Sequence, residues 1–368
     1  MLRPPQQPPI GLPSDEMASA LRAARLKNGR TLARQAGLLG VSARQYRRYE
    51  TRETALPTHR AAILYENTQR DIVARLPANR SGRDFVVGDL HGHGPALRRF
   101  LTTRDFNPTR DRVLSVGDLV DRGPDSLDSL RLLCEPWFYA VRGNHEDMLL
   151  DSLLGQEHYG RADLDHPFIA NGGDWVLHLS SDERDELRYR LLPRVALLPH
   201  ILIVGTGDRR YHVVHAELDG PKARVTDAVL DRLESGTGPD IVPIEYIEGF
   251  DGADHWRMRL LWGRSLVGAS LAGPDVPGLS PTFVGHTIVR QVFQRGSHIF
   301  LDTGAARMKA TAPQLAAAAQ ESSADARARL AALHAKIAHI TVLEIPQGDV
   351  SAISPLAIFA DHANPDSE

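Results

Sequence analysis

The chain has 368 residues, of which 42% are hydrophobic and 24% are charged, and its formal net charge at pH 7 is −3. These values lie near those of soluble globular proteins and exclude collagenous, low-complexity and fully disordered classes. No apolar run reaches the roughly 18 residues of a membrane-spanning helix, no secretory signal is recognisable at the start, and the single cysteine, Cys134, cannot form an internal disulfide; we expect a cytoplasmic protein without membrane contact.

The distribution of charge predicts two functional units. Residues 15–75 contain 12 Lys or Arg and only 6 Asp or Glu, although the whole chain is net negative. A boundary is expected after residue 76, because Pro77, Ser81 and Gly82 interrupt the helical periodicity there. The predicted parts are a disordered leader at 1–13, an all-α helical domain at 14–76, a larger α/β domain at 83–360 and a disordered tail at 361–368.

Within the helical domain, residues 31–50 have the pattern of two short helices joined by a turn. Gly40 lies in the turn, and Ser42 is placed to cap the second helix. This segment resembles the helix-turn-helix of phage repressors of the Cro/C1 type, which implies DNA or RNA contact; the alternative is a protein-interaction module with a solvated basic face. The side chains suited to phosphate and base-edge contact are Arg44, Gln45, Arg47 and Arg48.

From residue 84 onward, short β-branched runs alternate with helical stretches, which predicts a central sheet covered by helices. The first three predicted strands are each followed by a helix. Later strands have fewer helices between them, so a mixed sheet or two facing sheets fits better than a purely parallel sheet. The expected strands lie at 85–88, 112–117, 138–142, 201–204, 211–215, 282–285, 299–302 and 340–345, and the helices at 95–101, 126–133 and 146–154.

Polar side chains capable of binding metal follow the first three strands. The three glycine-flanked motifs begin 29 and then 26 residues apart, about one βαβ unit each, so neighbouring strand ends should bring them together. Two further histidines follow later apolar strands in the same way. Carboxylate, amide and imidazole donors suit Mn, Fe or Zn. The candidate ligands are Asp89, His91, Asp118, Asn144, His215 and His286.

Hydrolysis of a phosphate ester would use such a set of ligands. Two ions about 3.5 to 4 Å apart can share a carboxylate, lower the pKa of a bridging water and neutralise phosphoryl oxygens. Arg122 and Arg264 are candidates for a bidentate grip on those oxygens. A histidine ordered by a carboxylate can protonate the leaving oxygen, and His145 with Asp121 is the candidate pair.

These motifs resemble those of metallophosphoesterases of the phosphoprotein phosphatase family, closest to phage and bacterial serine/threonine protein phosphatases. The resemblance runs from about residue 84 to residue 304 and resumes near 339. It implies a calcineurin-like β-sandwich flanked by helices, with two divalent metal ions, Mn first and Fe or Zn as alternatives. By this resemblance Asp89, His91 and Asp118 hold one ion, Asp118, Asn144, His215 and His286 hold the other, Arg122 and Arg264 bind phosphate, and His145 with Asp121 forms the general-acid dyad.

The resemblance implies a phosphomonoesterase that acts on phosphorylated serine or threonine, and also on phosphotyrosine if specificity is dual, by in-line attack of a metal-bridging hydroxide. One alternative is a dinucleoside polyphosphate or cyclic-nucleotide hydrolase of the same fold, against which the histidine at position 91 argues. Another is a DNA-binding regulator with an accessory phosphatase domain. The partners expected are a phosphorylated protein or a small phosphoester.

Four further features of the sequence carry separate expectations. Glu217 stands where many members have glycine, and we expect it to crowd the site or change substrate choice. An alanine-rich helical insert is predicted at about 308–336. Residues 171–175 resemble a loop of the phage and bacterial members, and Trp262 is expected to pack in the core and position Arg264.

Overall fold

The computed structural model describes residues 36, 42–51, 53–54, 73–159, 166–196, 198–218, 225–234, 255–268, 278–308 and 339–358. The chain divides into two compact units. The first consists of Met1–Asp71, Leu150–Asp165 and Val176–Leu198, and the second of Ile72–Leu149, His166–Trp175 and Pro199–Glu368. The predicted leader and tail, and the predicted insert beyond residue 308, lie outside the described residues. Across the described part of the chain, no helix combines the length and hydropathy needed to cross a membrane.

In the first unit, the described part of the predicted helix-turn-helix consists of Ala36, which is helical and buried, and the second helix, α3 (Ala43–Glu50). Ser42 caps α3 as expected, because its side chain accepts a hydrogen bond of 3.1 Å from the backbone N–H of Gln45. The helix buries Tyr46 and Tyr49, whereas Gln45 is half-buried and the three candidate arginines are exposed. The unit also contains α9 (Ser181–Glu186), the π-helical turn η3 (Leu187–Leu191) and α10 (Leu192–Ala196).

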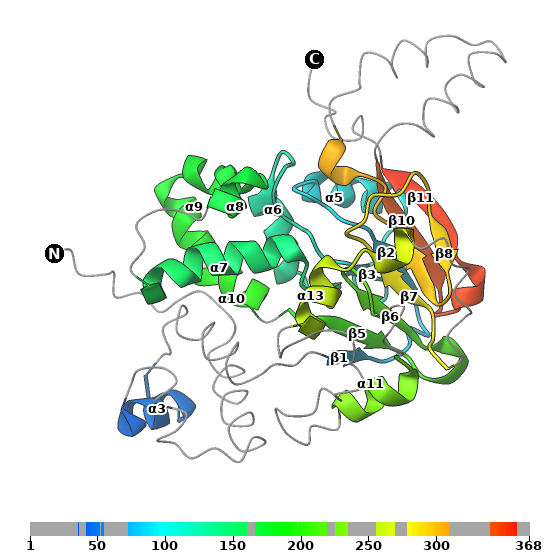
Figure 1. Ribbon diagram of the computed structural model, residues 1–368, viewed down its shortest axis with the longest axis horizontal. Helices are drawn as coiled ribbons and strands as arrows, with labels where there is room; N and C mark the ends of the chain where they lie inside the picture. Colours follow the sequence, from blue (N-terminus) through cyan, green and yellow to red (C-terminus); the bar gives the residue numbers. More distant parts are fainter. Residues whose placement is uncertain are drawn as a thin grey trace, which may run out of the picture. The chain divides into compact units, whose positions relative to one another are not determined.

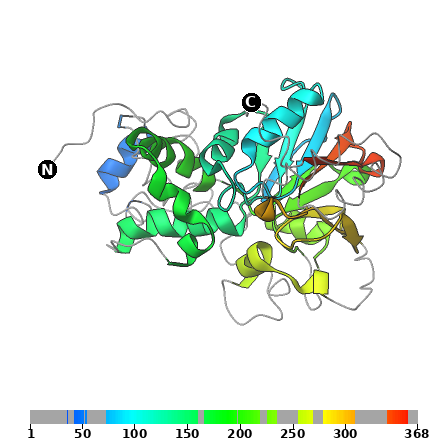
Figure 2. The same cartoon turned by 90° about the horizontal axis from the view of Figure 1, so that it is seen from above.

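The second unit is built on two mixed sheets, which Figures 1 and 2 show as two layers of strands. Both sheets contain parallel and antiparallel neighbours, as the sequence predicted. One has the order β1 (Val73–Leu76), β5 (Ile201–Val204), β6 (Tyr211–Val214), β7 (Thr282–Val284), β9 (His298–Phe300) and β8 (Phe293–Arg295). The other has the order β11 (Ser354–Ile358), β10 (Ile340–Pro346), β2 (Arg83–Val87), β3 (Arg112–Ser115) and β4 (Phe138–Ala140).

The main hydrophobic core lies between the two sheets. Val86 and Leu114 of one sheet belong to the same buried cluster as Val213 and Phe283 of the other. A second cluster covers the opposite face of the six-stranded sheet, where side chains of the helices pack on those of β5 and β7. The helices of the unit are α5 (Gly94–Thr103), α6 (Ser126–Arg131), the first part of α7 (Asn144–Tyr159), α8 (His166–Ala170), α11 (Asp227–Glu234), α13 (His255–Trp262) and α14 (Ser265–Gly268).

Three strands escaped the sequence analysis, and all three lie at sheet edges: β1, β8 and β11. The described residues of β1 and β8 are half-buried or exposed, so their sequences lack the continuous apolar run of a central strand. For β1 the structure corrects a predicted boundary. Residues 73–76, assigned to the helical domain at 14–76, pair in parallel with β5 in the larger sheet. Residues 150–165 and 176–198 likewise group with the first unit rather than with the rest of 83–360.

A buried ionic cluster around Asp84 ties the two sheets together. Asp84, at the start of β2, accepts hydrogen bonds from Nε and Nη2 of Arg112, both at 2.7 Å, from the first residue of β3. It also accepts one of 2.6 Å from the hydroxyl of Tyr211, the first residue of β6 in the other sheet, and one of 3.1 Å from Asn79 Nδ2. The Asp84 side chain is fully buried, so its charge depends on these partners.

We expect Asp84→Asn to lower the free energy of unfolding by about 3–5 kcal/mol, because it breaks a buried ion pair and leaves Arg112 without a full counter-charge. Urea denaturation measures the change. The matched control is Glu135→Gln, which removes the carboxylate from a half-exposed pair with Arg98 and should cost about 1 kcal/mol or less. Equal losses in the two variants would contradict the proposed role of Asp84.

Candidate active site

The three polar loops meet because β2, β3 and β4 are parallel neighbours, so their carboxyl ends share one edge of the sheet. The backbone locks the first two loops together: the N–H groups of Leu90 and His91 donate to the carbonyl of Asp118 at 3.0 and 2.8 Å. Of the seven non-glycine residues with positive φ among the described residues, five are predicted site residues. Such strain accumulates where a fold holds functional side chains. The five are His91, Asp118, Asp121, Arg122 and His286.

One group of electron-pair donors surrounds Asn144, the first residue of α7. The Asn144 Oδ1 atom lies 2.8 Å from Nε2 of His215 and 2.9 Å from Nδ1 of His286, and His215 Nε2 lies 3.4 Å from Asp118 Oδ1. His215 Nδ1 lies 2.8 Å from the carbonyl oxygen of Val116, which can only accept, so Nδ1 carries the proton. The lone pair of Nε2 therefore faces other acceptors.

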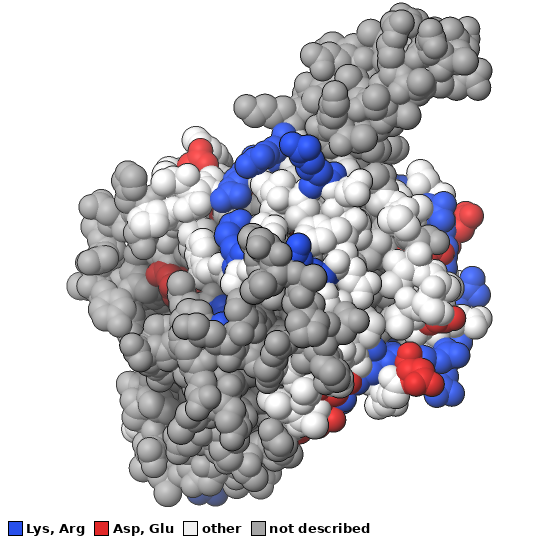
Figure 3. Space-filling model, turned by 45° about the vertical axis from the view of Figure 1, so that its right-hand side comes forward, with Lys and Arg blue, Asp and Glu red and all other residues white. Residues whose placement is uncertain are grey.

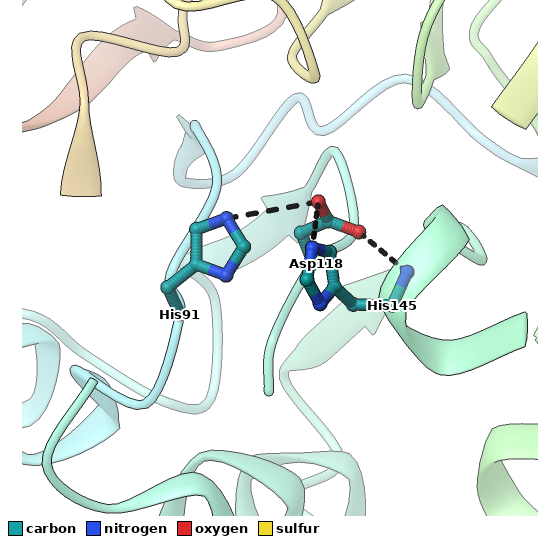
Figure 4. Close-up of side chains that lie close together, drawn as sticks. All are labelled: His91, Asp118 and His145. Atoms are coloured by element: carbon teal, nitrogen blue, oxygen red, sulfur yellow. Dashed lines mark hydrogen bonds and ion pairs between the residues drawn. The ribbon is translucent and has the colours of Figure 1, made fainter. Parts of the chain in front are cut away.

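A second group contains His91, Asp118 and His145. The imidazole rings of the two histidines both point toward the Asp118 carboxylate (Figure 4). His91 Nδ1 lies 3.0 Å from the carbonyl oxygen of Val120 and carries the proton for the same reason. Its Nε2 lone pair then faces Asp118 Oδ2 at 3.7 Å, and His145 Nε2 lies 3.9 Å from the same oxygen. Asp118 is common to both groups, which suits a ligand shared by two ions.

Asp89, the remaining predicted ligand, lies in neither of these groups. Its oxygens accept from the backbone N–H of His286 at 3.2 and 3.1 Å. Burial, followed by the negative charges of Asp302 and Asp118, raises the pKa of Asp89 well above its ordinary value. The structure thus brings five predicted ligands together and places the sixth against the backbone of one of them.

The donor set fits two divalent cations. Burial, as the largest cause, lowers the pKa of His91 and of His286 to about 3, so both rings are neutral. Neutral imidazoles whose other nitrogen donates to a carbonyl, arranged around a buried carboxylate, are the usual surroundings of a protein-bound metal ion. A cation would also separate acceptors that otherwise repel.

Glu146 holds the second and third loops in place, a role that the sequence analysis did not assign. Its buried carboxylate accepts hydrogen bonds from the backbone N–H groups of Gly143, Asp118 and Leu119 at 2.9, 2.9 and 2.7 Å. Burial and then the charge of Asp118 raise the pKa of Glu146 to about 7. Gly143 permits this approach, since a Cβ there would lie 2.2 Å from Asp118 Oδ1. The only feature of the sequence that could have indicated this role is the place of Glu146 at the end of the third glycine-flanked motif, residues 143–146.

The predicted dyad is formed. His145 Nδ1 lies 2.6 Å from Asp121 Oδ2, and Trp175 Nε1 donates to Asp121 Oδ1 at 2.7 Å. Burial opposes protonation of the imidazole, but Asp118 and then Asp121 outweigh it, so the pKa of His145 is raised above its ordinary value. The ring can therefore hold a proton near the shared carboxylate. Sequence analysis noted the loop containing Trp175 without assigning it this contact.

Both predicted phosphate-binding arginines are exposed and close enough to affect the site. Besides burial, the charge of Arg122 lowers the pKa of His91, and that of Arg264 lowers the pKa of His286. Figure 3 shows one face of the protein, on whose upper part Lys and Arg side chains form an arc. Trp262, which was predicted to pack in the core, is 37% exposed. Its ring packs edge-on against the ring of His286, with the two ring centroids 5.7 Å apart.

Glu217, which was expected to crowd the site or change substrate choice, contacts the start of α14. It is buried and accepts hydrogen bonds from Ser265 Oγ at 2.7 Å and from the backbone N–H of Leu266 at 2.6 Å. These two residues begin α14, directly after Arg264. The extra carboxylate therefore anchors the turn that presents Arg264.

Comparison with known proteins agrees with this arrangement. The chain is 33% identical over 222 residues to serine/threonine-protein phosphatase 2 of Escherichia coli (strain K12), covering 60% of this chain and 86% of that protein. It is 38% identical over 149 residues to serine/threonine-protein phosphatase 1 of Salmonella typhimurium (strain LT2), covering 40% and 64%. It is 31% identical over 184 residues to a symmetrical bis(5'-nucleosyl)-tetraphosphatase of Paracidovorax citrulli (strain AAC00-1), covering 47% and 62%.

The sequence profile of calcineurin-like phosphoesterases matches residues 85–253, which include five of the six candidate metal ligands and the dyad. The two sheets, the buried donor groups around Asp118 and the similarity over most of a phosphatase lead to one conclusion. The chain belongs to the calcineurin-like phosphoesterase family and is a metallophosphatase.

Proposed function

We propose that this protein removes phosphate from serine and threonine side chains of phosphoproteins, with two divalent ions, Mn²⁺ first, bound around Asp118. The observation that carries the proposal is that Nε2 of His91 and Nε2 of His215 both face this one buried carboxylate, at 3.7 and 3.4 Å, while Asn144 Oδ1 lies 2.8 Å from the same His215 nitrogen. The similarity to two bacterial serine/threonine-protein phosphatases supports the choice of substrate.

The residues of this chain divide the work of hydrolysis among them. The bound ions would supply Lewis-acid polarisation of the phosphoryl group and activation of water; Asp89, His91 and Asp118 would hold one, and Asp118, Asn144, His215 and His286 the other. Arg122 and Arg264 would orient the phosphoryl oxygens. As the oxygen of water bonds to phosphorus and the ester P–O bond breaks, the His145 imidazolium, whose Nδ1–H is held by Asp121, would give its Nε2-bound proton to the departing alcohol oxygen, leaving inorganic phosphate.

A second candidate is hydrolysis of symmetrical dinucleoside tetraphosphates, which the similarity to a tetraphosphatase favours. The same metal ligands and the same two arginines could bind a phosphoanhydride substrate and support its hydrolysis. Its leaving group is a nucleotide phosphate, which needs less protonation than an alcohol does, so the raised pKa of His145 supports the phosphoprotein substrate.

We also propose that the first unit contacts nucleic acid through α3. Arg44, Arg47 and Arg48 lie exposed on one short helix whose tyrosines are buried. Planar guanidinium groups suit phosphates and base edges. Such contact would recruit the phosphatase to DNA or to a DNA-bound phosphoprotein.

Asp118→Asn should remove the shared ligand charge. The protein as prepared with Mn²⁺ should hold two equivalents of metal by elemental analysis, the variant fewer, and hydrolysis should fall by about 1,000-fold or more, since metal stabilisation is worth several kcal/mol. Chelation should abolish wild-type hydrolysis and added Mn²⁺ should restore it. The control Asp208→Asn changes an exposed carboxylate in η4 (Gly207–Arg209) and should retain both metals. An active, fully loaded Asp118→Asn protein would refute the assignment.

The substrate proposal is tested by kcat/KM values for phosphoserine, phosphothreonine and phosphotyrosine peptides, diadenosine tetraphosphate and cyclic nucleotides on one metal-loaded preparation. Phosphoserine or phosphothreonine should be preferred by at least about tenfold, about 1.4 kcal/mol of differential transition-state binding. A preference for the tetraphosphate would replace this proposal with the second candidate.

For nucleic acid, we expect duplex binding by the full chain to weaken with salt, and the double change Arg47→Ala and Arg48→Ala to reduce the slope of log K against log[salt] by about 2. Fluorescence anisotropy measures it. The matched control changes two exposed arginines of the other unit, Arg80→Ala and Arg110→Ala. Identical slopes in the two double variants would count against α3 as the contact surface.

A further inference from the structure

The segment 171–175, referred to as the 171–175 loop, consists of the turn after α8 and the start of the 3-10 helix η2 (Gly173–His178). It contacts the two consecutive residues that the mechanism assigns to different tasks. Asp121 orders the proton donor and Arg122 binds phosphate, yet both side chains are held by this one loop. Both also have positive φ, 71° and 69°. Two adjacent residues in this conformation are strained, so their geometry depends on what packs against them.

On the Asp121 side, the contact comes from Trp175. Its indole Nε1–H donates to Asp121 Oδ1 at 2.7 Å, while Asp121 Oδ2 lies 2.6 Å from His145 Nδ1. Each carboxylate oxygen thus has one partner, and the backbone N–H of Asp121 donates to Ser126 Oγ at 2.8 Å. The indole fixes the plane of the carboxylate, and through it the orientation of the imidazole.

On the Arg122 side, the contact comes from Asn171 and Gly172. The guanidinium donates from Nη2 to Asn171 Oδ1 at 3.1 Å and from Nε to the Asn171 carbonyl at 3.3 Å, and the backbone N–H of Arg122 donates to the Gly172 carbonyl at 3.4 Å. Gly172 has a φ of 95°, and a Cβ there would lie 2.7 Å from Arg122 N. An exposed arginine would otherwise sample many rotamers, and ordering it costs side-chain entropy.

The loop itself has a firm base. Phe168 of α8 is buried, and its ring lies so close to Gly173 that a Cβ at that position would come within 2.3 Å of it. Asn171 Nδ2 also donates to the Pro167 carbonyl at 2.9 Å. The side chains that reach Asp121 and Arg122 are therefore fixed by packing rather than by the substrate.

We propose that residues 171–175 form a positioning element, in which Trp175 orients the proton-donating dyad through Asp121 and Asn171 orients the phosphate-binding Arg122. The inference rests on the proposed function. It assigns no chemistry to the loop: Trp175 and Asn171 act through other residues, and each acts on a different kinetic parameter.

The first test is Trp175→Phe, which keeps an aromatic ring and removes the N–H. General-acid catalysis contributes about 100- to 10,000-fold and matters for an alcohol leaving group more than for p-nitrophenol. We expect kcat to fall about tenfold with a phosphoserine peptide and by less than about twofold with p-nitrophenyl phosphate. The matched control is Trp137→Phe, whose ring packs on Phe106 and Phe138; both of its rates should stay at the wild-type level.

A double variant checks the route of the effect. Because Trp175 acts through Asp121, Asp121→Asn combined with Trp175→Phe should lose no more activity than Asp121→Asn alone. Additive losses would show that the indole acts elsewhere. Equal falls with both substrates in Trp175→Phe would show a merely structural role and overturn the proposal for Trp175.

The second test is Asn171→Leu, which removes the Oδ1 acceptor at similar volume. We expect KM to rise about fivefold with both substrates while kcat changes little, and Asn171→Asp, which restores the acceptor oxygens, to recover the wild-type KM. Inorganic phosphate should bind the metal-loaded Asn171→Leu protein about fivefold more weakly by calorimetry. An unchanged KM and phosphate affinity would overturn the proposal for Asn171.

One measurement separates failure of this inference from failure of the proposed function. The Nδ1–H of His145 should give a downfield proton resonance, identified by its loss in His145→Gln, that shifts in Trp175→Phe and not in Trp137→Phe. This readout needs neither turnover nor metal. If the wild type hydrolyses no ester, the proposed function fails, but the proton resonance and the phosphate affinity still test the roles of Trp175 and Asn171. If the resonance is unshifted in Trp175→Phe, the role of Trp175 is overturned even in an active enzyme.

Discussion

The organisation of the second unit depends on one buried carboxylate, that of Asp118. Lone pairs of His91 and His215 point at it because the other nitrogen of each ring is committed to a backbone carbonyl. Acceptors crowded in this way repel in a low dielectric, and only positive charge between them can relieve the repulsion. The backbone strain at Asp118 and His286 is part of the same cost. This arrangement lowers the stability of the fold at this point and favours the binding of cations.

Rigid support surrounds this unstable centre. Glu146 satisfies three backbone N–H groups beneath the ligands, Glu217 fixes the turn before α14, and the loop at 171–175 holds Asp121 and Arg122. Three separate elements thus hold the loops of the site in place. Preorganised dipoles and charges lower a reaction barrier because they need not rearrange during the reaction.

Sequence reasoning reached the central strands and the ligands because both leave local patterns. An apolar run followed by Gly-Asp or Gly-Asn marks β2, β3 and β4 and their loops. Edge strands leave no such run, which is why β1 and β8 were missed. The supporting roles of Glu146 and Glu217 were missed for another reason: a carboxylate that accepts backbone N–H groups from distant loops cannot be told from a solvated one until the tertiary contacts exist.

The position of β1 has a practical consequence for dividing this protein. A cut at the proline after Leu76 looks natural in the sequence, but it would strip off the strand that hydrogen-bonds to β5 along four residues. The uncovered β5 is wholly apolar, Ile201–Val204, and an unprotected apolar edge invites pairing with another molecule. A shortened protein that starts at residue 77 would then self-associate, and loss of solubility would be mistaken for dependence on the N-terminal unit.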